Sequence, residues 1–311
     1  MSTPHWAARK ERGSFILMKF TVWASGVLGR RLLTPLLYAI VLYFFVTGAQ
    51  ARRSIAQYQR YLAQYSGRAE LLPSRSSVFK HFMQFADALL DKIDVWHGRL
   101  GFAHLDVDDP QHIRPQIWQQ NQRGQLLVGS HLGNLEVCRA LAELGRKAKL
   151  NILVHTKHAE QFNRLLKNAG AEHLNLIQVS ELDTAVMLQL SQRLDRGEWL
   201  AIAGDRVPLQ GARVVDVDFL GHKAAFAQGP WLLAGLLECP VNLLFCLKHQ
   251  GRYQICLEPF TDRVVWRRSD RQQVLAQHIQ AYAERLQHYC LRAPYQWFNF
   301  YPYWKQHEQQ D

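Results

Sequence analysis

Hydrophobic positions follow one pattern in the first third of the chain and another in the rest. Up to residue 96, apolar residues recur at helical spacing in four segments, 15–29, 32–46, 54–65 and Val78 to Trp96. The N-terminal third is therefore predicted to be a succession of helices.

From about Gly101 onward, short apolar runs alternate with amphipathic segments. The short runs predict strands at 125–129, 150–155, 174–179, 199–203, 214–219, 240–247 and 252–258. The amphipathic segments predict helices at 134–147, 158–169, 183–196 and 228–238, and a long helix follows at about 269–291. This alternation is typical of an α/β fold in which helices flank a mostly parallel sheet.

The most apolar stretch is 32–48, an uncharged run of 17 residues at the lower limit for crossing a bilayer. Arginine pairs precede and follow it, so the positive-inside rule gives no orientation. A membrane span, a helix lying in the membrane interface and a buried soluble helix pair all remain open. We expect a helical, membrane-associating segment over 1–70 and an α/β domain over 71–311.

Charge is concentrated in the same N-terminal segment. Residues 1–70 contain ten Lys or Arg and two Glu, so they carry +8 of the net charge of +11. A basic, aromatic-rich end suits an anionic lipid surface, and it could also suit nucleic acid. The lipid surface is favoured because the charge lies beside the most apolar helices and no nucleic-acid motif is present.

The five cysteines are scattered and form no C-x-x-C pair, which argues against a zinc or dithiol redox site. They are expected to be free thiols that pack as small core residues in a reducing environment.

The segment QLLVGSHLGNLE (Gln125 to Glu136) carries the most informative chemistry. A predicted strand ends at Gly129-Ser130, a turn holds His131 to Gly133, and Asn134 is a candidate cap for the next helix. His131 thus lies at the carboxyl end of a strand, where open α/β sheets bind ligands. The turn lets the carboxylate of Glu136 fold back onto the imidazole, an arrangement that suits general-base catalysis. The spacing of His131 and Glu136 alone is weak evidence for catalysis, since a His and a Glu at this spacing more often have a structural role.

The same block resembles a known family. HLGNLE (His131 to Glu136) is similar to the H-x4-D/E motif of the glycerolipid and lysophospholipid acyltransferases, and to the HFGNWE form of the lipid A late acyltransferases. Further similar features are the sequences ERG at 11–13, AGDR at 203–206, FLG at 219–221, GPWLLA at 229–234, CPV at 239–241 and PYQW at 294–297. The resemblance covers most of the chain.

The resemblance implies transfer of a fatty-acyl group from an acyl-acyl carrier protein to a hydroxyl or amine of a membrane lipid. It implies His131 as general base, Glu136 as its orienting carboxylate, and no metal or organic cofactor. It also implies a bacterial inner membrane location with the catalytic domain on the cytoplasmic side. The residues assigned to substrate binding are Gly133, Asn134, Lys157, Asp205 and Arg206.

Asp205 and Arg206 have more than one interpretation. They could contact an acceptor phosphate or support the His131–Glu136 pair, because Arg suits bidentate phosphate contacts. They could equally form an ion pair in a surface loop.

The sequence departs from the family pattern at three positions. Leu132 and Leu135 replace aromatic residues, and Lys157 stands where an Arg is expected. These departures leave the acceptor open. The rival interpretation is a catalytically inactive membrane protein of the same fold that binds a lipid or a partner, and retention of both His131 and Glu136 argues against it.

Overall fold

The computed structural model describes residues 34–96, 98–117, 122–135, 137, 149–154, 174–178, 184–207 and 213–304. The predicted helices at 15–29 and 158–169, and most of that at 134–147, lie outside these residues.

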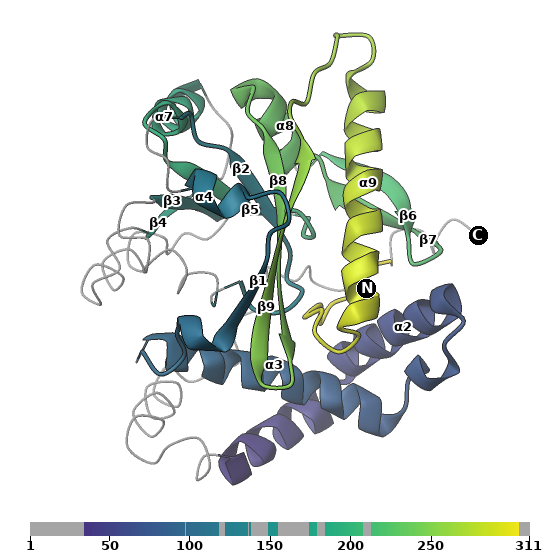
Figure 1. The fold of residues 1–311 in the computed structure, drawn as a ribbon. Helices are drawn as coiled ribbons and strands as arrows, with labels where there is room; N and C mark the ends of the chain where they lie inside the picture. The colour runs from purple at the N-terminus through teal and green to yellow at the C-terminus, as the bar shows by residue number, and fades with distance from the viewer. Residues whose placement is uncertain are drawn as a thin grey trace.

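A seven-stranded sheet forms the centre of the molecule, with the strand order β1-β9-β8-β2-β5-β3-β4 (Figure 1). Its strands are β1 (Leu105–Asp108), β2 (Leu126–Gly129), β3 (Leu150–Val154), β4 (Leu174–Gln178), β5 (Trp199–Ala203), β8 (Val241–His249) and β9 (Arg252–Thr261). Neighbouring strands are parallel except β8 and β9. The predicted mostly parallel α/β sheet is confirmed.

Tight turns explain the antiparallel pairs. Gln250 and Gly251, both with positive φ, connect β8 to β9 as a two-residue hairpin. Leu220 and Gly221 do the same for β6 (Val214–Phe219) and β7 (His222–Ala227), which form a separate two-stranded sheet. Each turn reverses the chain between two strands that pair directly.

Helices cover the sheet and cross one of its ends. They are α2 (Ala49–Ser66), α3 (Arg75–Trp96), α4 (Ile113–Ile117), α7 (Thr184–Asp195), α8 (Gly229–Leu237) and α9 (Arg271–Arg292), with short 3-10 turns at Ala69–Leu71 and Phe102–His104. In Figure 1, α9 runs beside β8 and β9, while α2 and α3 lie across the lower end of the view. The helices predicted at 183–196, 228–238 and 269–291 are confirmed as α7, α8 and α9.

Two strands were not anticipated from the sequence, β1 and β7. The sequence of β1, LDVD, has four residues of which two are acidic, and β7 reads HKAAFA, which is poor in the β-branched residues that mark strands. Both are strands because of their partners: β1 pairs with β9 at the sheet edge, and the buried alanines of β7 pair with β6.

The main hydrophobic core joins the sheet to helices from both ends of the chain. Tyr58 and Leu62 of α2 pack in the same cluster as Leu126 of β2 and Tyr282 of α9. Trp297, which follows α9, is 1% exposed in this cluster. The aromatic C-terminal segment is therefore core packing, and it lies beside the strand ends.

The first described helix, Thr34–Thr47, meets α2 at a bend of 90°. Gly48 occupies the bend, where a Cβ atom would lie 2.5 Å from the carbonyl oxygen of Phe44, so a side chain would not fit. In the described part of the chain, no single helix is long and apolar enough to cross a membrane; this bent pair could do so by length and composition. The predicted helices at 32–46 and 54–65 are thus present, and the proposed division near residue 70 stays a prediction.

Candidate active site

Sheet register brings His131 and Asp205 to the same place. β2 and β5 are adjacent and parallel, and their last residues, Gly129 and Ala203, are register partners. His131 and Asp205 each lie two residues beyond those partners, and the backbone N–H of Gly204 donates to the carbonyl of Gly129 at 2.9 Å. The two side chains therefore meet at the carboxyl edge of the sheet, where α/β folds place ligands.

Three N–H groups converge on the carboxylate of Asp205. The His131 ring Nδ1 lies 2.8 Å from Oδ1, and the His131 backbone N–H donates to Oδ2 at 2.8 Å. The indole Nε1–H of Trp297 also donates to Oδ2, at 3.0 Å. Asp205 is buried at 2% exposure, whereas the His131 side chain is 38% exposed. The pair thus has a buried acceptor and an imidazole that reaches solvent.

These contacts keep Asp205 ionised. Burial by itself would raise the pKa of Asp205. The attraction and hydrogen bonds of His131, together with the charge of Arg206, outweigh burial, so the pKa lies below its ordinary value. Because an ionised carboxylate only accepts hydrogen bonds, Nδ1 of His131 carries the proton of a neutral imidazole and Nε2 is left as the basic nitrogen.

The turn after His131 depends on glycine. Gly133 has a φ of +75°, and a Cβ atom there would lie 1.8 Å from the carbonyl oxygen of Cys246. This close approach places the next N–H, that of Asn134, 2.9 Å from the same oxygen. Gly133 therefore allows the turn to dock against β8, because any side chain would push it away.

The C-terminal segment covers the other side of this turn. The N–H of Phe298 donates to the carbonyl of His131 at 2.9 Å, and the N–H of Gly133 donates to the carbonyl of Gln296 at 2.8 Å. Leu132 and Trp297 form an isolated antiparallel bridge between these hydrogen bonds. The backbone of His131 is thus held on both sides, by β5 through Asp205 and by the C-terminal segment.

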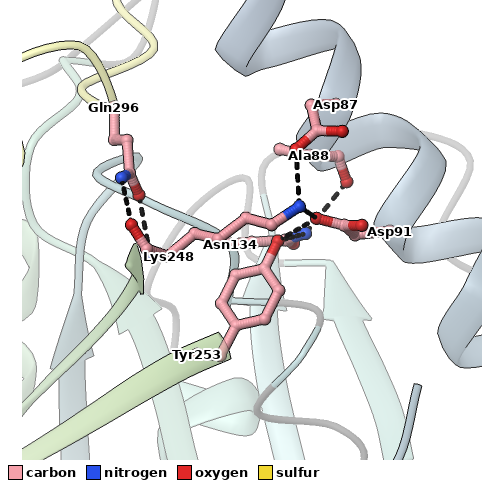
Figure 2. A network of polar contacts seen from close by, with 7 residues as sticks. All are labelled: Asp87, Ala88, Asp91, Asn134, Lys248, Tyr253 and Gln296. Atoms are coloured by element: carbon pink, nitrogen blue, oxygen red, sulfur yellow. Dashed lines mark hydrogen bonds and ion pairs between the residues drawn. The ribbon is translucent and has the colours of Figure 1, made fainter. Parts of the chain in front are cut away.

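A buried polar network holds β8 and the C-terminal segment to α3 (Figure 2). Lys248 forms ion pairs with Asp87 at 2.5 Å and Asp91 at 2.6 Å, and the Tyr253 hydroxyl donates to Asp91. Burial and the neighbouring Asp91 raise the pKa of Tyr253, so its hydroxyl stays protonated. The amide side chain of Gln296 forms two hydrogen bonds with the Lys248 backbone, at 2.9 and 2.7 Å.

Asn134 belongs to the same network. Its amide nitrogen donates to the carbonyl of Ala88 at 2.9 Å and lies 3.4 Å from the hydroxyl of Tyr253. The side chain is 2% exposed and faces α3 and β9. In this structure Asn134 anchors the turn, and its assignment to substrate binding stays a prediction.

The remaining predicted site residues divide into two groups. Arg206 is half-buried, donates to the carbonyl of Phe298 at 3.2 Å, and lies over the ring of Tyr301 at 5.7 Å. Glu136 and Lys157 lie outside the described residues. The structure therefore brings His131, Gly133, Asn134, Asp205 and Arg206 to one end of the sheet, and the roles predicted for the seven site residues remain to be tested.

Several residues of the site were not singled out from the sequence. Trp297 was noted only as part of a family-like PYQW element, and Lys248, Asp91 and Tyr253 carried no motif. The available signal for Trp297 was its place in PYQW, but its contact with Asp205 depends on how the end of α9 crosses the strand ends. The network of Lys248 joins residues 157 or more positions apart, so local patterns do not reveal it.

Comparison with known proteins identifies the family of the chain. The family model for bacterial lipid A biosynthesis acyltransferases matches residues 80–306, which include most of α3, the sheet, His131, Asp205 and Trp297. A search of curated proteins gave no match. The family match covers well over half of the chain. The chain therefore belongs to the bacterial lipid A biosynthesis acyltransferase family.

Proposed function

We propose that the chain transfers a fatty-acyl group from an acyl-acyl carrier protein to a hydroxyl or amine of a lipid A-type acceptor, with His131 as general base. The observation that carries this proposal is the hydrogen bond between Nδ1 of His131 and the buried, ionised Asp205, with the imidazole half-exposed. A neutral imidazole anchored through Nδ1 presents Nε2 to an incoming substrate.

The reaction follows from this geometry. Nε2 takes the proton from the acceptor hydroxyl while its oxygen attacks the thioester carbonyl carbon. The attack forms the acyl–oxygen bond and a tetrahedral intermediate, which re-forms its carbonyl by breaking the carbon–sulfur bond and expelling the carrier thiolate. The imidazolium returns the proton to the thiolate and is again neutral. During the cycle Asp205 stabilises the imidazolium and keeps its orientation, the role of the carboxylate in serine hydrolase triads.

Two carboxylates compete for the orienting role. Glu136 was predicted for it from the motif, and the geometry supports Asp205, which lies 2.8 Å from Nδ1. We assign the positioning role to Asp205 and retain the prediction that Glu136 contributes to transfer. Comparing Asp205→Asn with Glu136→Gln separates the two, because each change removes one charge and preserves the side-chain size.

The proposal includes a membrane-bound enzyme on the cytoplasmic side of the inner membrane. The helix Thr34–Thr47 exposes a row of large apolar side chains, Leu36, Tyr38, Leu42, Tyr43 and Val46. The same helix packs inward through Val41 and Phe45. An outward apolar face next to a basic N-terminal segment suits insertion into an anionic lipid surface. The basic surface also suits an acidic carrier protein as acyl donor.

The test is acyl transfer by purified full-length protein in detergent, with acyl-acyl carrier protein as donor and a lipid A precursor as acceptor. His131→Ala is expected to lower turnover by about 10²–10⁴-fold while the melting temperature is kept. Asp205→Asn is expected to give a large loss too, since the carboxylate charge that stabilises the imidazolium disappears. His249→Gln, at an exposed position on β8, serves as a matched control. A folded His131→Ala protein with normal turnover would refute the mechanism, and wild-type protein that binds lipid but transfers no acyl group would favour the inactive alternative.

A further inference from the structure

Trp297 makes a contact that no other buried tryptophan makes in the described part of the chain. Its indole N–H donates to Oδ2 of Asp205 at 3.0 Å. The indole nitrogens of Trp231 and Trp304 are also buried, and they have no hydrogen-bond partner among the described residues. A buried polar group without a partner costs free energy, so the N–H groups of those two tryptophans do not favour their burial. The packing of their apolar rings explains why they are buried. It does not explain why Trp297 directs its N–H at the carboxylate that contacts His131.

The backbone on both sides of Trp297 delivers the indole to this place. The carbonyl of Trp297 lies 2.9 Å from Nε2 of the fully buried His81. The next residue, Phe298, donates its N–H to the carbonyl of His131. With α3 on one side and the His131 turn on the other, the ring has one orientation, and the ring of Tyr58 packs against it at 5.0 Å. The indole is therefore a preorganised donor.

The contact controls how the carboxylate of Asp205 is rotated. Oδ2 accepts from two donors, the backbone N–H of His131 and the indole of Trp297, and Oδ1 is left for Nδ1. With a single donor on Oδ2, the carboxylate can turn about its Cβ–Cγ bond, and Oδ1 then moves off the Nδ1–H direction. Hydrogen bonds weaken with such misalignment.

We propose that Trp297 is a positioning residue for acyl transfer: its indole N–H locks the Asp205 carboxylate in the rotation that orients the His131 imidazole. This inference rests on the proposed general-base function of His131. The residue acts through Asp205, so its loss lowers turnover without weakening substrate binding.

The experiment removes the N–H and keeps the ring. In the full-length protein, Trp297→benzothienylalanine replaces the N–H by sulfur at nearly constant shape. We expect kcat to fall about tenfold, equivalent to about 1.4 kcal/mol, with the KM for both substrates unchanged. The same replacement at Trp231, whose indole nitrogen makes no hydrogen bond, is the matched control and keeps the wild-type kcat.

A second readout needs no acyl transfer. Diethyl pyrocarbonate modifies the basic nitrogen of an exposed imidazole, and peptide mass spectrometry at neutral pH gives the rate at His131. We expect this rate to fall several-fold in the Trp297 variant and to match wild type in the Trp231 variant. The reason is that a carboxylate of Asp205 that is no longer aligned with Nδ1 makes Nε2 less nucleophilic.

The outcomes separate the two proposals. Unchanged kcat and unchanged modification of His131 in the Trp297 variant would overturn the positioning role. A lower melting temperature with both rates unchanged would overturn it as well, since that is the signature of packing alone. If wild-type protein transfers no acyl group but the modification rate falls as expected, the positioning role stands and the proposed function fails.

Discussion

Replacing His81 by glutamine should flatten the dependence of stability on pH in the acid range. His81 lies in α3 at 0% exposure, and its Nε2 lies 2.9 Å from the carbonyl of Trp297. Burial lowers the pKa of His81 from 6.5 to about 4. A glutamine side chain places an amide donor near the position of Nε2, so His81→Gln keeps the hydrogen bond and removes the titration.

The sign and size follow from linkage. Between pH 6.5 and about 4 the unfolded chain binds a proton at His81 and the folded chain does not, so protons favour unfolding. Stability is fully present above pH 6.5 and falls as the pH decreases through this window. The difference in pKa corresponds to about 3 kcal/mol at 1.36 kcal/mol per unit. For a domain of this size, about 3 kcal/mol is on the order of 6–12 °C in melting temperature.

The assay is the melting temperature of parent and variant at intervals from pH 7.5 to 4.5. Other groups also titrate in this window. One is His288, whose pKa is lowered by burial and by the charges of Arg285 and Arg292. The informative quantity is therefore the difference between the two curves. The melting temperature of His81→Gln should rise relative to that of the parent as the pH falls, and the curve of His249→Gln, at an exposed position, should coincide with that of the parent. Parallel curves for the parent and His81→Gln would refute the assignment of His81 as a buried neutral histidine.

Two further outcomes are expected. Arg206→Ala should raise the acceptor KM, or lower kcat/KM by about 1.5–3 kcal/mol, with little change for the donor, if Arg206 binds an anionic headgroup; unchanged acceptor kinetics with a lower melting temperature would assign it to its contact with Phe298 instead. The full-length protein should sediment with membranes and stay there in high salt, because apolar insertion survives screening; complete release by salt alone would show that the helix Thr34–Thr47 does not insert.

Much of the sheet could be predicted because its strands are short apolar runs between polar turns. The seven strands expected from the sequence are present, and the longest two, β8 and β9, exceed their predicted ends because they pair with each other along their whole length. Strand order could not be predicted in this way. In the sheet β2 lies between β5 and β8, although β3 is the strand that follows β2 in the chain. Which strands become neighbours in the sheet depends on tertiary packing.

The candidate site was predictable in part for the same reason. His131 was found because the strand, the turn and Gly133 are contiguous in the sequence. The contact between His131 and Asp205 spans 74 residues and requires that β2 and β5 be neighbours. Trp297 comes from a segment after the last helix, whose path over the strand ends no local pattern specifies. Patterns along the chain thus single out His131 and, through the AGDR element, Asp205 as candidates, and the fold shows that the two side chains meet.

The same reasoning bears on the positions that depart from the family pattern. Leu132 is one of the departures from the family pattern that left the acceptor open, yet its side chain is fully buried in the main core with Tyr58 and Trp297. Leu135 packs against a separate buried hydrophobic cluster that includes Leu127, and it approaches Gly129 of β2. A change between leucine and an aromatic ring at position 132 therefore alters core packing behind the turn, because the residue points away from the exposed imidazole of His131. We expect the choice of acceptor to depend on residues that share the solvent-facing side of His131, and the half-buried Arg206, next to Asp205 in the chain, is one described candidate that a kinetic experiment can test first.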